Sequence, residues 1–348
     1  MFLAHAKDPG LLRREVEALS RPSLVVVDEV QRVPRLLNTL QALMDDLPLK
    51  HRYLLSGSSA RKLKAGGANL LPGRIVVEHL PPLTVFEAGK DFEVERALQI
   101  GMLPGVQLDP EGGTDVLGTY ADTYLREEIR GEAVVREIGS YARFLDVMAL
   151  TSGQWLNYSK LSSDTEIPKE TFRRFVGILE DTLLAVRLPA CVPRHRTTRR
   201  VGQRDRVLLF DVGVRNALLG LHRRPPTADQ IGGLFEQWFI LQVHALRQLA
   251  RQGWELSSYR TEGGAEVDLV VETDDRIYGV EIKSGRTVGA QDTRGLESLG
   301  EMVGKGKPYT KLVAYTGQTR QRFPSKAEAW PWREVLELFL GLFDVGPG

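Results

Sequence analysis

Hydrophobic and polar positions follow different periods in successive parts of the chain. A continuous apolar run at Leu24–Val27 predicts a strand buried on both faces of a parallel sheet, and Tyr53–Leu55 predicts a second strand. Helical spacing before and between these runs predicts two helices, and Arg74–Val77 is a third β-rich run. This pattern predicts an α/β domain over residues 1–90.

The pattern becomes helical over residues 91–190. Within this part, Leu156–Leu184 predicts a helix-turn-helix, with the turn at Thr165–Pro168, and Leu184–Leu188 is expected to begin the wing of a winged helix. A basic segment that contains one strand follows over residues 191–230. The apolar positions of the second helix are expected to pack inward, and they are Phe172, Phe175, Ile178 and Leu179.

Residues 231–348 show the order helix, strand, hairpin, helix, strand. The hairpin consists of two runs that alternate charged and apolar residues on either side of a turn at Thr273–Arg276. With the turn centred between its two aspartates, Asp268 faces Glu281 and Glu266 faces Lys283. Three acidic groups and a lysine therefore converge on one face of the hairpin.

This convergence provides what a hydrolytic Mg²⁺ site needs. Two carboxylates, Asp268 and Glu281, can hold the metal, and Lys283 can orient or activate water for attack on a phosphodiester. A solvated hairpin with a surface ion pair between Glu266 and Lys283 is the alternative. The apolar residues on the opposite face of the hairpin favour a packed domain over that alternative.

The same residues resemble the PD-(D/E)xK phosphodiesterase superfamily, in which Asp268, Glu281 and Lys283 match D…ExK. Glu236, on the preceding predicted helix, matches the acidic residue that many members carry on their first helix. Val267 stands where the superfamily's name has a proline. The resemblance implies a restriction-endonuclease-like αβββαβ domain, with Glu236, Asp268 and Glu281 on the metal and Lys283 in catalysis.

Near the N-terminus, two carboxylates follow the first predicted strand directly. Ligands bind at the carboxyl ends of strands in open α/β sheets, so Asp28 and Glu29 are expected at a binding edge. The second strand runs into Ser56 and Ser58, which are expected at that same edge. The segments DEVQRVP and LLSGSSARKLKAGGANLLPGR, the helical middle, and the EVD and EIK runs together resemble AAA-like ATPases of bacteria and archaea that carry a C-terminal domain of unknown function.

This resemblance implies Mg²⁺ and ATP as cofactors. Asp28 and Glu29 would be the Walker B pair, with Glu29 catalytic, Ser56 or Ser58 would be the sensor, and Arg74 would face phosphate. The phosphate-binding motif G-x-x-x-x-G-K-S/T occurs nowhere in the 348 residues. The chain as written is therefore expected to bind ATP poorly, with Met1 a miscalled start or the gene truncated.

Basic residues make DNA a candidate partner. Lys169, Arg173 and Arg174 are expected to point outward from the second helix of the helix-turn-helix. Six arginines lie between positions 194 and 206, against one acid, at Arg194, Arg196, Arg199, Arg200, Arg204 and Arg206. An interdomain helical pair with a solvated basic loop is the alternative, and winged helices also contact proteins.

The composition indicates the compartment of the protein but not its binding partner. The net charge is +1, and the single cysteine, Cys191, cannot form an internal disulfide, which fits a reducing cytoplasm. No apolar run reaches the roughly 18 residues of a membrane helix. The sequence indicates no oligomeric state.

The prediction is a cytoplasmic AAA-like, DNA-associated protein with a nuclease-like domain. A Mg²⁺-dependent nuclease and a non-catalytic DNA-binding or interaction protein are the alternatives.

Overall fold

The computed structural model describes residues 2–8, 10–46, 50–57, 75–109, 111–124, 138–191, 205–250, 253–304 and 306–342. Contacts divide the chain into two compact units, which are Met1–Val77 with Val176–Leu184 and Glu78–Phe175 with Ala185–Gly348. The fold is mixed α/β, as the sequence predicts. No helix in the described ranges is long and apolar enough to cross a membrane.

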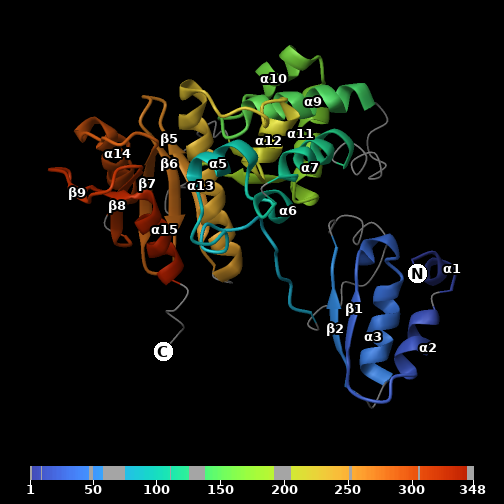
Figure 1. The fold of residues 1–348 in the computed structure, drawn as a ribbon. Coiled ribbons are helices and arrows are strands. Elements are labelled where there is room, and N and C mark those ends of the chain that lie inside the picture. The colour runs from blue at the N-terminus through green and yellow to red at the C-terminus, as the bar shows by residue number, and fades with distance from the viewer. Residues whose placement is uncertain are drawn as a thin grey trace. The chain divides into compact units, whose positions relative to one another are not determined.

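The first unit contains a two-stranded parallel sheet with helices on one face. In chain order its elements are α1 (Phe2–Lys7), α2 (Leu11–Glu17), β1 (Leu24–Val27), the 3₁₀ turn η1 (Val30–Arg32), α3 (Leu36–Asp46) and β2 (Arg52–Leu55). Figure 1 shows α2 and α3 on the same side of the strands, where Leu40 and Leu43 of α3 are fully buried. The predicted helices and both predicted strands are confirmed.

Two predictions for this unit are wrong. Among the described residues, β1 is covered on one face only, because the helices pack against Val25 and Val27, while Leu24 and Val26 are 53% and 60% exposed. Residues 75–77 of the third β-rich run belong to no strand, and Val76 is 77% exposed. A β-branched run forms a strand only where it finds a ladder partner, and none is present for this run among the described residues.

The middle of the chain is helical. Its elements are α5 (Val94–Ile100), α6 (Pro104–Gln107), α7 (Gly113–Thr119), the π-turn η2 (Tyr120–Tyr124), α9 (Ile138–Thr151), α10 (Tyr158–Thr165), α11 (Lys169–Asp181), β3 (Ala185–Leu188), β4 (Arg206–Leu209) and α12 (Val212–Leu218). The strands β3 and β4 pair antiparallel. Helices α10 and α11 and strand β3 occur where the helix-turn-helix and the first wing strand are predicted.

The C-terminal part is a six-stranded mixed sheet between two layers of helices. Its elements are α13 (Ala228–Ala250), β5 (Glu255–Arg260), β6 (Glu266–Glu272), β7 (Ile277–Lys283), the 3₁₀ turn η3 (Ala290–Thr293), α14 (Arg294–Val303), β8 (Tyr309–Tyr315), β9 (Gln321–Arg322), β10 (Glu328–Pro331) and α15 (Trp332–Gly341). The strand order is β5-β6-β7-β8-β10-β9. The order helix, three strands, helix, strand is as predicted, and β9 and β10 extend it.

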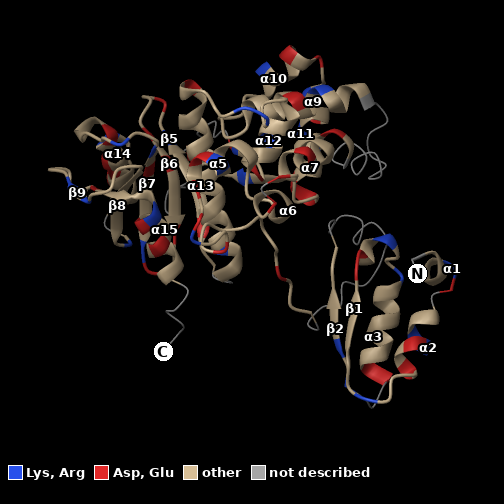
Figure 2. Ribbon diagram, in the orientation of Figure 1, with Lys and Arg blue, Asp and Glu red and all other residues tan. Residues whose placement is uncertain are grey.

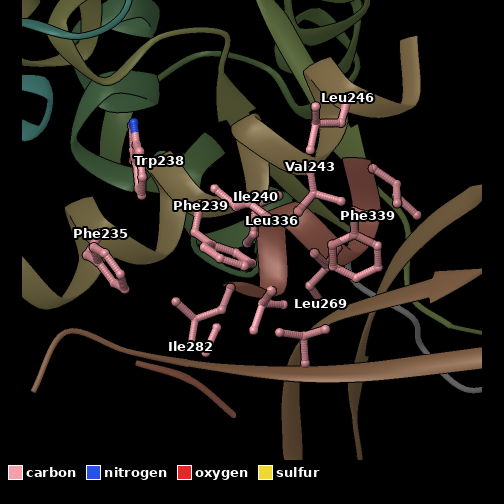
Figure 3. Close-up of a cluster of buried hydrophobic side chains, with 14 of the residues drawn as sticks. Phe235, Trp238, Phe239, Ile240, Val243, Leu246, Leu269, Ile282, Leu336 and Phe339 are labelled. Carbon is pink, nitrogen blue, oxygen red and sulfur yellow. The ribbon is translucent and has the colours of Figure 1, made fainter. Parts of the chain in front are cut away.

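Each face of this sheet has its own core. On one face, α13 and α15 bury Phe239, Val243 and Phe339 against Leu269 and Ile282, as Figure 3 shows. On the other face, α14 buries Leu296 and Leu299 against Val267 and Val270. The first core also takes in Val85, Ala97 and Leu98, which precede or belong to α5, so the middle and C-terminal parts share apolar packing.

Candidate functional site

The first candidate site lies where β1 and β2 end. Because these strands are parallel and pair Val27 with Leu55, the residues that follow them meet at one edge. The Ser56 hydroxyl donates to the Asp28 carboxylate and accepts from the Glu29 backbone N–H at 3.1 Å. The predicted proximity of Asp28, Glu29 and Ser56 is therefore present, and the Ser56 hydroxyl bonds directly to the Asp28 side chain and the Glu29 backbone.

Glu29 has a strained backbone. Its φ of 54° lies in the left-handed region, which residues other than glycine seldom adopt outside turns and functional sites. The Gln31 side-chain amide donates to Glu29 Oε2 at 2.8 Å, and Arg32 lies 3.6 Å from that oxygen. These contacts orient the Glu29 carboxylate toward Gln31 and Arg32. Ser58 and Arg74 lie outside the described residues, so their predicted roles stay predictions.

The second candidate site is the acidic cluster, defined as Glu236 of α13, Asp268 of β6, Glu281 of β7 and the neighbouring Lys283. The hairpin register is as predicted, because Leu269 pairs with Val280 and Glu272 with Ile277. The Lys283 ammonium lies 2.8 Å from Glu281 Oε1, and Asp268 Oδ2 accepts the backbone N–H of Ile282 at 2.8 Å. The structure therefore brings the predicted side chains together.

A β-bulge in β6 aims Asp268 into the cluster. Along β5, Ser257 and Tyr259 are two positions apart, yet their partners Val270 and Val267 are three positions apart. One extra residue of β6 is thus accommodated at Asp268 and Leu269. Bulges of this kind re-aim side chains and recur beside active sites. The side-chain alternation of β6 breaks at this point, which lets Asp268 turn toward β7.

Charge and burial give the cluster unusual proton affinities. Burial raises the pKa of Asp268 well above its ordinary value, and the nearby carboxylates of Glu236 and Glu281 raise it further. Burial likewise raises the pKa of Glu281, against the effect of Lys283. Burial opposes the charge on Lys283, but Glu281 and Asp268 outweigh it and raise that pKa. The cluster therefore favours an additional positive charge.

Two residues from the middle of the chain, neither of which was predicted to lie here, contact the cluster or its neighbour Glu266. Arg206 of β4 is 3% exposed and ion-pairs with Glu236, and its Nη1 donates to the Asp268 carbonyl at 3.1 Å. The Trp155 indole N–H donates to Glu266, and both Arg206 and Arg260 lie 5.8 Å from the indole ring. Glu266 is therefore not paired with Lys283.

The position of Arg206 corrects one prediction. It was grouped with the basic segment, yet it is buried against acids because it begins β4, whose four residues are all buried. Arg199, Arg200 and Arg204 lie outside the described residues, so their contact with nucleic acid stays a prediction. A signal for Arg206 was present in the sequence, since it directly precedes the apolar run Val207–Phe210.

The exposed basic residues of α11 lie as predicted. Lys169, Arg173 and Arg174 are exposed, while Phe172 and Phe175 of the same helix are buried. Arg173 pairs with Glu170 at 2.9 Å and lies 5.3 Å from the Tyr158 ring, so part of its charge is balanced within the helix. Acidic and basic residues are interspersed over the described elements of both units (Figure 2).

Asp268 and Glu281 are the candidate metal ligands of the acidic cluster. In the described part of the chain, no group of three or more Asp, Glu, His or Cys side chains is arranged to hold a metal ion. Mg²⁺ is commonly bound by one or two carboxylates, with water as its other ligands. Glu281 Oε2 is buried with no hydrogen-bond partner, so it has an unused acceptor beside Asp268. Glu236 is held by Arg206, and its role as a ligand stays a prediction.

Two uncharacterized proteins, one of Mycobacterium bovis and one of Mycobacterium tuberculosis, are similar to this chain. Each is 28% identical over 271 residues, which is 76% of this chain and 59% of the relative. The chain thus spans about three fifths of the length of these curated relatives. No solved structure matches the chain.

Three domain families match successive parts of the chain. Residues 3–88 match an AAA domain, residues 91–224 match a domain of unknown function (DUF8612), and residues 231–335 match a domain of unknown function (DUF4143). The second candidate site draws on both of the latter segments, because Arg206 and Trp155 lie in one and Glu236, Asp268 and Glu281 in the other. The chain therefore combines an N-terminal AAA domain with a C-terminal DUF4143 domain, as its sequence resemblance implies.

Proposed function

We propose that this protein is a cytoplasmic, AAA-type, DNA-associated protein whose C-terminal domain is a Mg²⁺-dependent phosphodiesterase. The observation that carries the proposal is the acidic cluster, where Glu281 Oε2 is buried without a partner beside Asp268, with Lys283 2.8 Å from Glu281 Oε1. Two carboxylates of raised pKa and one lysine at the end of a hairpin suit phosphodiester hydrolysis.

The residues of the acidic cluster would have different roles in hydrolysis. Asp268 and Glu281 would hold Mg²⁺, which supplies a Lewis acid and lowers the pKa of bound water. Lys283 is 35% exposed at its side chain, so its ammonium can reach both the Glu281 carboxylate and a phosphate group. It would orient the attacking water and stabilise charge that develops on the phosphate oxygens. The apolar face of the hairpin keeps this geometry rigid.

The N-terminal site would respond to nucleotide. The AAA domain match and the Asp28–Ser56 hydrogen bond support a Walker B and sensor arrangement. The printed sequence lacks G-x-x-x-x-G-K-S/T, whose backbone amides and lysine supply much of the affinity for phosphate. Nucleotide binding by the 348-residue chain is accordingly weak in this proposal.

DNA would be contacted through the exposed basic side chains of α11 and the segment that carries Arg199, Arg200 and Arg204. Phosphate contacts release counterions, so binding should weaken steeply as salt rises. Replacing Arg199, Arg200 and Arg204 together with Glu should lower affinity for every DNA sequence. Unchanged binding by that variant in a fluorescence anisotropy titration would remove the basic segment from the proposal.

Nicking of supercoiled plasmid DNA tests the catalytic part. Mg²⁺ or Mn²⁺ should support nicking, whereas Ca²⁺ should bind without supporting it, because its looser coordination positions water badly. Asp268→Ala should abolish both metal binding and nicking, and Lys283→Ala should abolish nicking while leaving metal binding largely intact. Asp274→Asn, on the exposed hairpin turn, is the matched control and should nick like the parent chain.

A non-catalytic DNA-binding or interaction protein is the second candidate function. The pairing of Glu236 with Arg206 favours it, because a guanidinium then balances part of the charge that a metal would balance. Equal background nicking by the parent chain and Asp268→Ala, at every metal concentration, would decide for this second candidate.

A further inference from the structure

The Arg206 side chain makes three polar interactions, more than the single contact of an ordinary surface ion pair. Its Nε donates to the Gly153 carbonyl at 2.6 Å, its Nη1 donates to the Asp268 carbonyl at 3.1 Å, and its Nη2 pairs with Glu236. The side chain is 4% exposed and lies 5.8 Å from the Trp155 ring. Arginine presents its donors in a rigid planar fork, so three fixed acceptors define one orientation.

The acceptors belong to three different parts of the second unit. Gly153 follows α9 and has a φ of 80°, a conformation suited to glycine, and its carbonyl faces Arg206. Asp268 lies on β6 and Glu236 on α13. The middle segment therefore places a permanent positive charge inside the acidic cluster of the C-terminal domain.

We propose that Arg206 is a positioning residue that takes the place of a metal ion at Glu236. The guanidinium pairs with the Glu236 carboxylate and donates to the adjoining Asp268 carbonyl. The cluster therefore binds at most one divalent ion, through Asp268 and Glu281. Glu236 then holds Arg206 rather than metal. This inference deepens the proposed function, because the binding of one ion by Asp268 and Glu281 rests on it. The exclusion of metal from Glu236 can be tested separately.

Electrostatics predicts the direction of the effect. A unit charge within a few ångströms of a bound cation repels it by several kcal/mol even at an effective dielectric constant of about 20. Replacing Arg206 with neutral Gln should free Glu236 and raise Mn²⁺ affinity by about tenfold or more. Glu236→Gln keeps an acceptor for Arg206 but leaves its charge unbalanced, so it should lower Mn²⁺ affinity, by less than the loss of a metal ligand does. Asp268→Asn should lower it by at least about tenfold, because a ligand is lost.

Calorimetric titration of the full chain with Mn²⁺ tests these expectations without any activity assay. The titration compares the parent chain, Arg206→Gln, Glu236→Gln and Asp268→Asn, each first checked for a cooperative thermal transition. One ion per chain and the predicted order of affinities support the inference. Loss of binding in Glu236→Gln as large as in Asp268→Asn would overturn it, because Glu236 would then be a ligand.

The outcomes for the two proposals are separable. If the parent chain binds no Mn²⁺ but Arg206→Gln does, the phosphodiesterase proposal fails for this chain and the role of Arg206 is upheld. If a folded Arg206→Gln chain binds no more tightly than the parent, the role of Arg206 is overturned whatever the parent does. Should Arg206→Gln fail to fold, Arg206→Met replaces it, since methionine fills much of the same space without a charge. A gain in Mn²⁺ affinity is expected there too, and no gain in a folded chain overturns the inference.

Discussion

The two candidate sites use similar residues in opposite surroundings. Asp28 and Glu29 follow a strand of a two-stranded sheet that is covered on one face, and Ser56 beside them is exposed. Asp268 and Glu281 lie in a six-stranded sheet covered on both faces, where burial raises their pKa values. The comparison teaches that packing, rather than residue type, decides which carboxylates need a counter-charge to stay ionised.

The largest expected difference concerns how the two units unfold. Phe239 and Leu40 are both fully buried, one in each unit, and replacing either with Ala should cost about 3 to 4 kcal/mol. All five tryptophans lie in the second unit, at Trp155, Trp238, Trp254, Trp330 and Trp332. In urea titrations, Phe239→Ala should therefore shift the tryptophan fluorescence transition, whereas Leu40→Ala should shift only the circular dichroism.

A fluorescence shift in Leu40→Ala would show that the two units unfold as one cooperative system. In that case the contrast between a sparsely and a densely packed region would not extend to their stability.

The next largest effect should come from acid. Burial lowers the pKa of His244 on α13 to about 4, so the unfolded chain takes up this proton at higher pH than the folded chain does. The contribution of His244 to stability should therefore fall as pH drops from 6.5 toward 4, by about 2 kcal/mol between pH 7 and pH 5. Urea titrations followed by tryptophan fluorescence measure this in the parent chain and in His244→Gln.

His244→Gln should remove this contribution, so the difference in stability between the two proteins should change by about 2 kcal/mol from pH 7 to pH 5. Asp211, whose burial raises its pKa to about 6, acts in the opposite direction over this range and is present in both proteins, so its contribution cancels. Identical pH profiles for the two proteins would show that solvent reaches His244 in the folded state.

Two substitutions with smaller expected effects on stability, one in each site, compare the sites directly. Because the folded-state pKa of Asp268 is raised, its ionisation costs stability as pH rises through that value, so Asp268→Asn should stabilise the metal-free chain at pH 7 by about 1 kcal/mol. Ser56→Ala removes a hydroxyl bonded to Asp28 and Glu29 and should destabilise the first unit by about 0.5 to 1 kcal/mol. Thermal melts followed by circular dichroism measure both, and shifts of the same sign would contradict the comparison.

The smallest expected effect is that of nucleotide. The 348-residue chain should show no thermal shift with millimolar ATP and Mg²⁺, whereas a ligand at a hundredfold excess over Kd would stabilise it by about 2.7 kcal/mol. A clear shift that Asp28→Ala abolishes would show that the N-terminal site binds nucleotide without the missing motif.

Local pattern predicted most of the elements and the strand pairings that bring the candidate site residues together. The hairpin register followed from alternation and the turn at Thr273–Arg276, because a period of two leaves few registers that bury Leu269 and Val280 together. The meeting of Asp28 with Ser56 followed from parallel strands ending at one edge. These features depend on neighbours in sequence or on a single pairing.

The contacts of Arg206 and Trp155 could not be predicted in this way. Arg206 lies 30 residues from Glu236, and Trp155 lies 111 residues from Glu266. The apolar run Val207–Phe210 marks the strand that Arg206 begins, but the acceptors of its side chain lie on α13 and β6 and are not encoded locally. The exposure of Leu24 and Val26 likewise depends on which elements cover the sheet, not on the strand itself.

The edges of the six-stranded sheet bear on how the protein behaves at high concentration. At one edge, Pro189 and Cys191 bond to Ser258 of β5 through backbone contacts of 2.9 and 2.7 Å. At the other edge, β9 has two residues, Gln321 and Arg322, both exposed and polar. Long unpaired edges recruit strands from other chains, and short, covered or charged edges prevent this. The short, polar β9 edge and the covered β5 edge therefore resist edge-to-edge strand pairing, and a fragment that begins after Cys191 would expose the β5 edge.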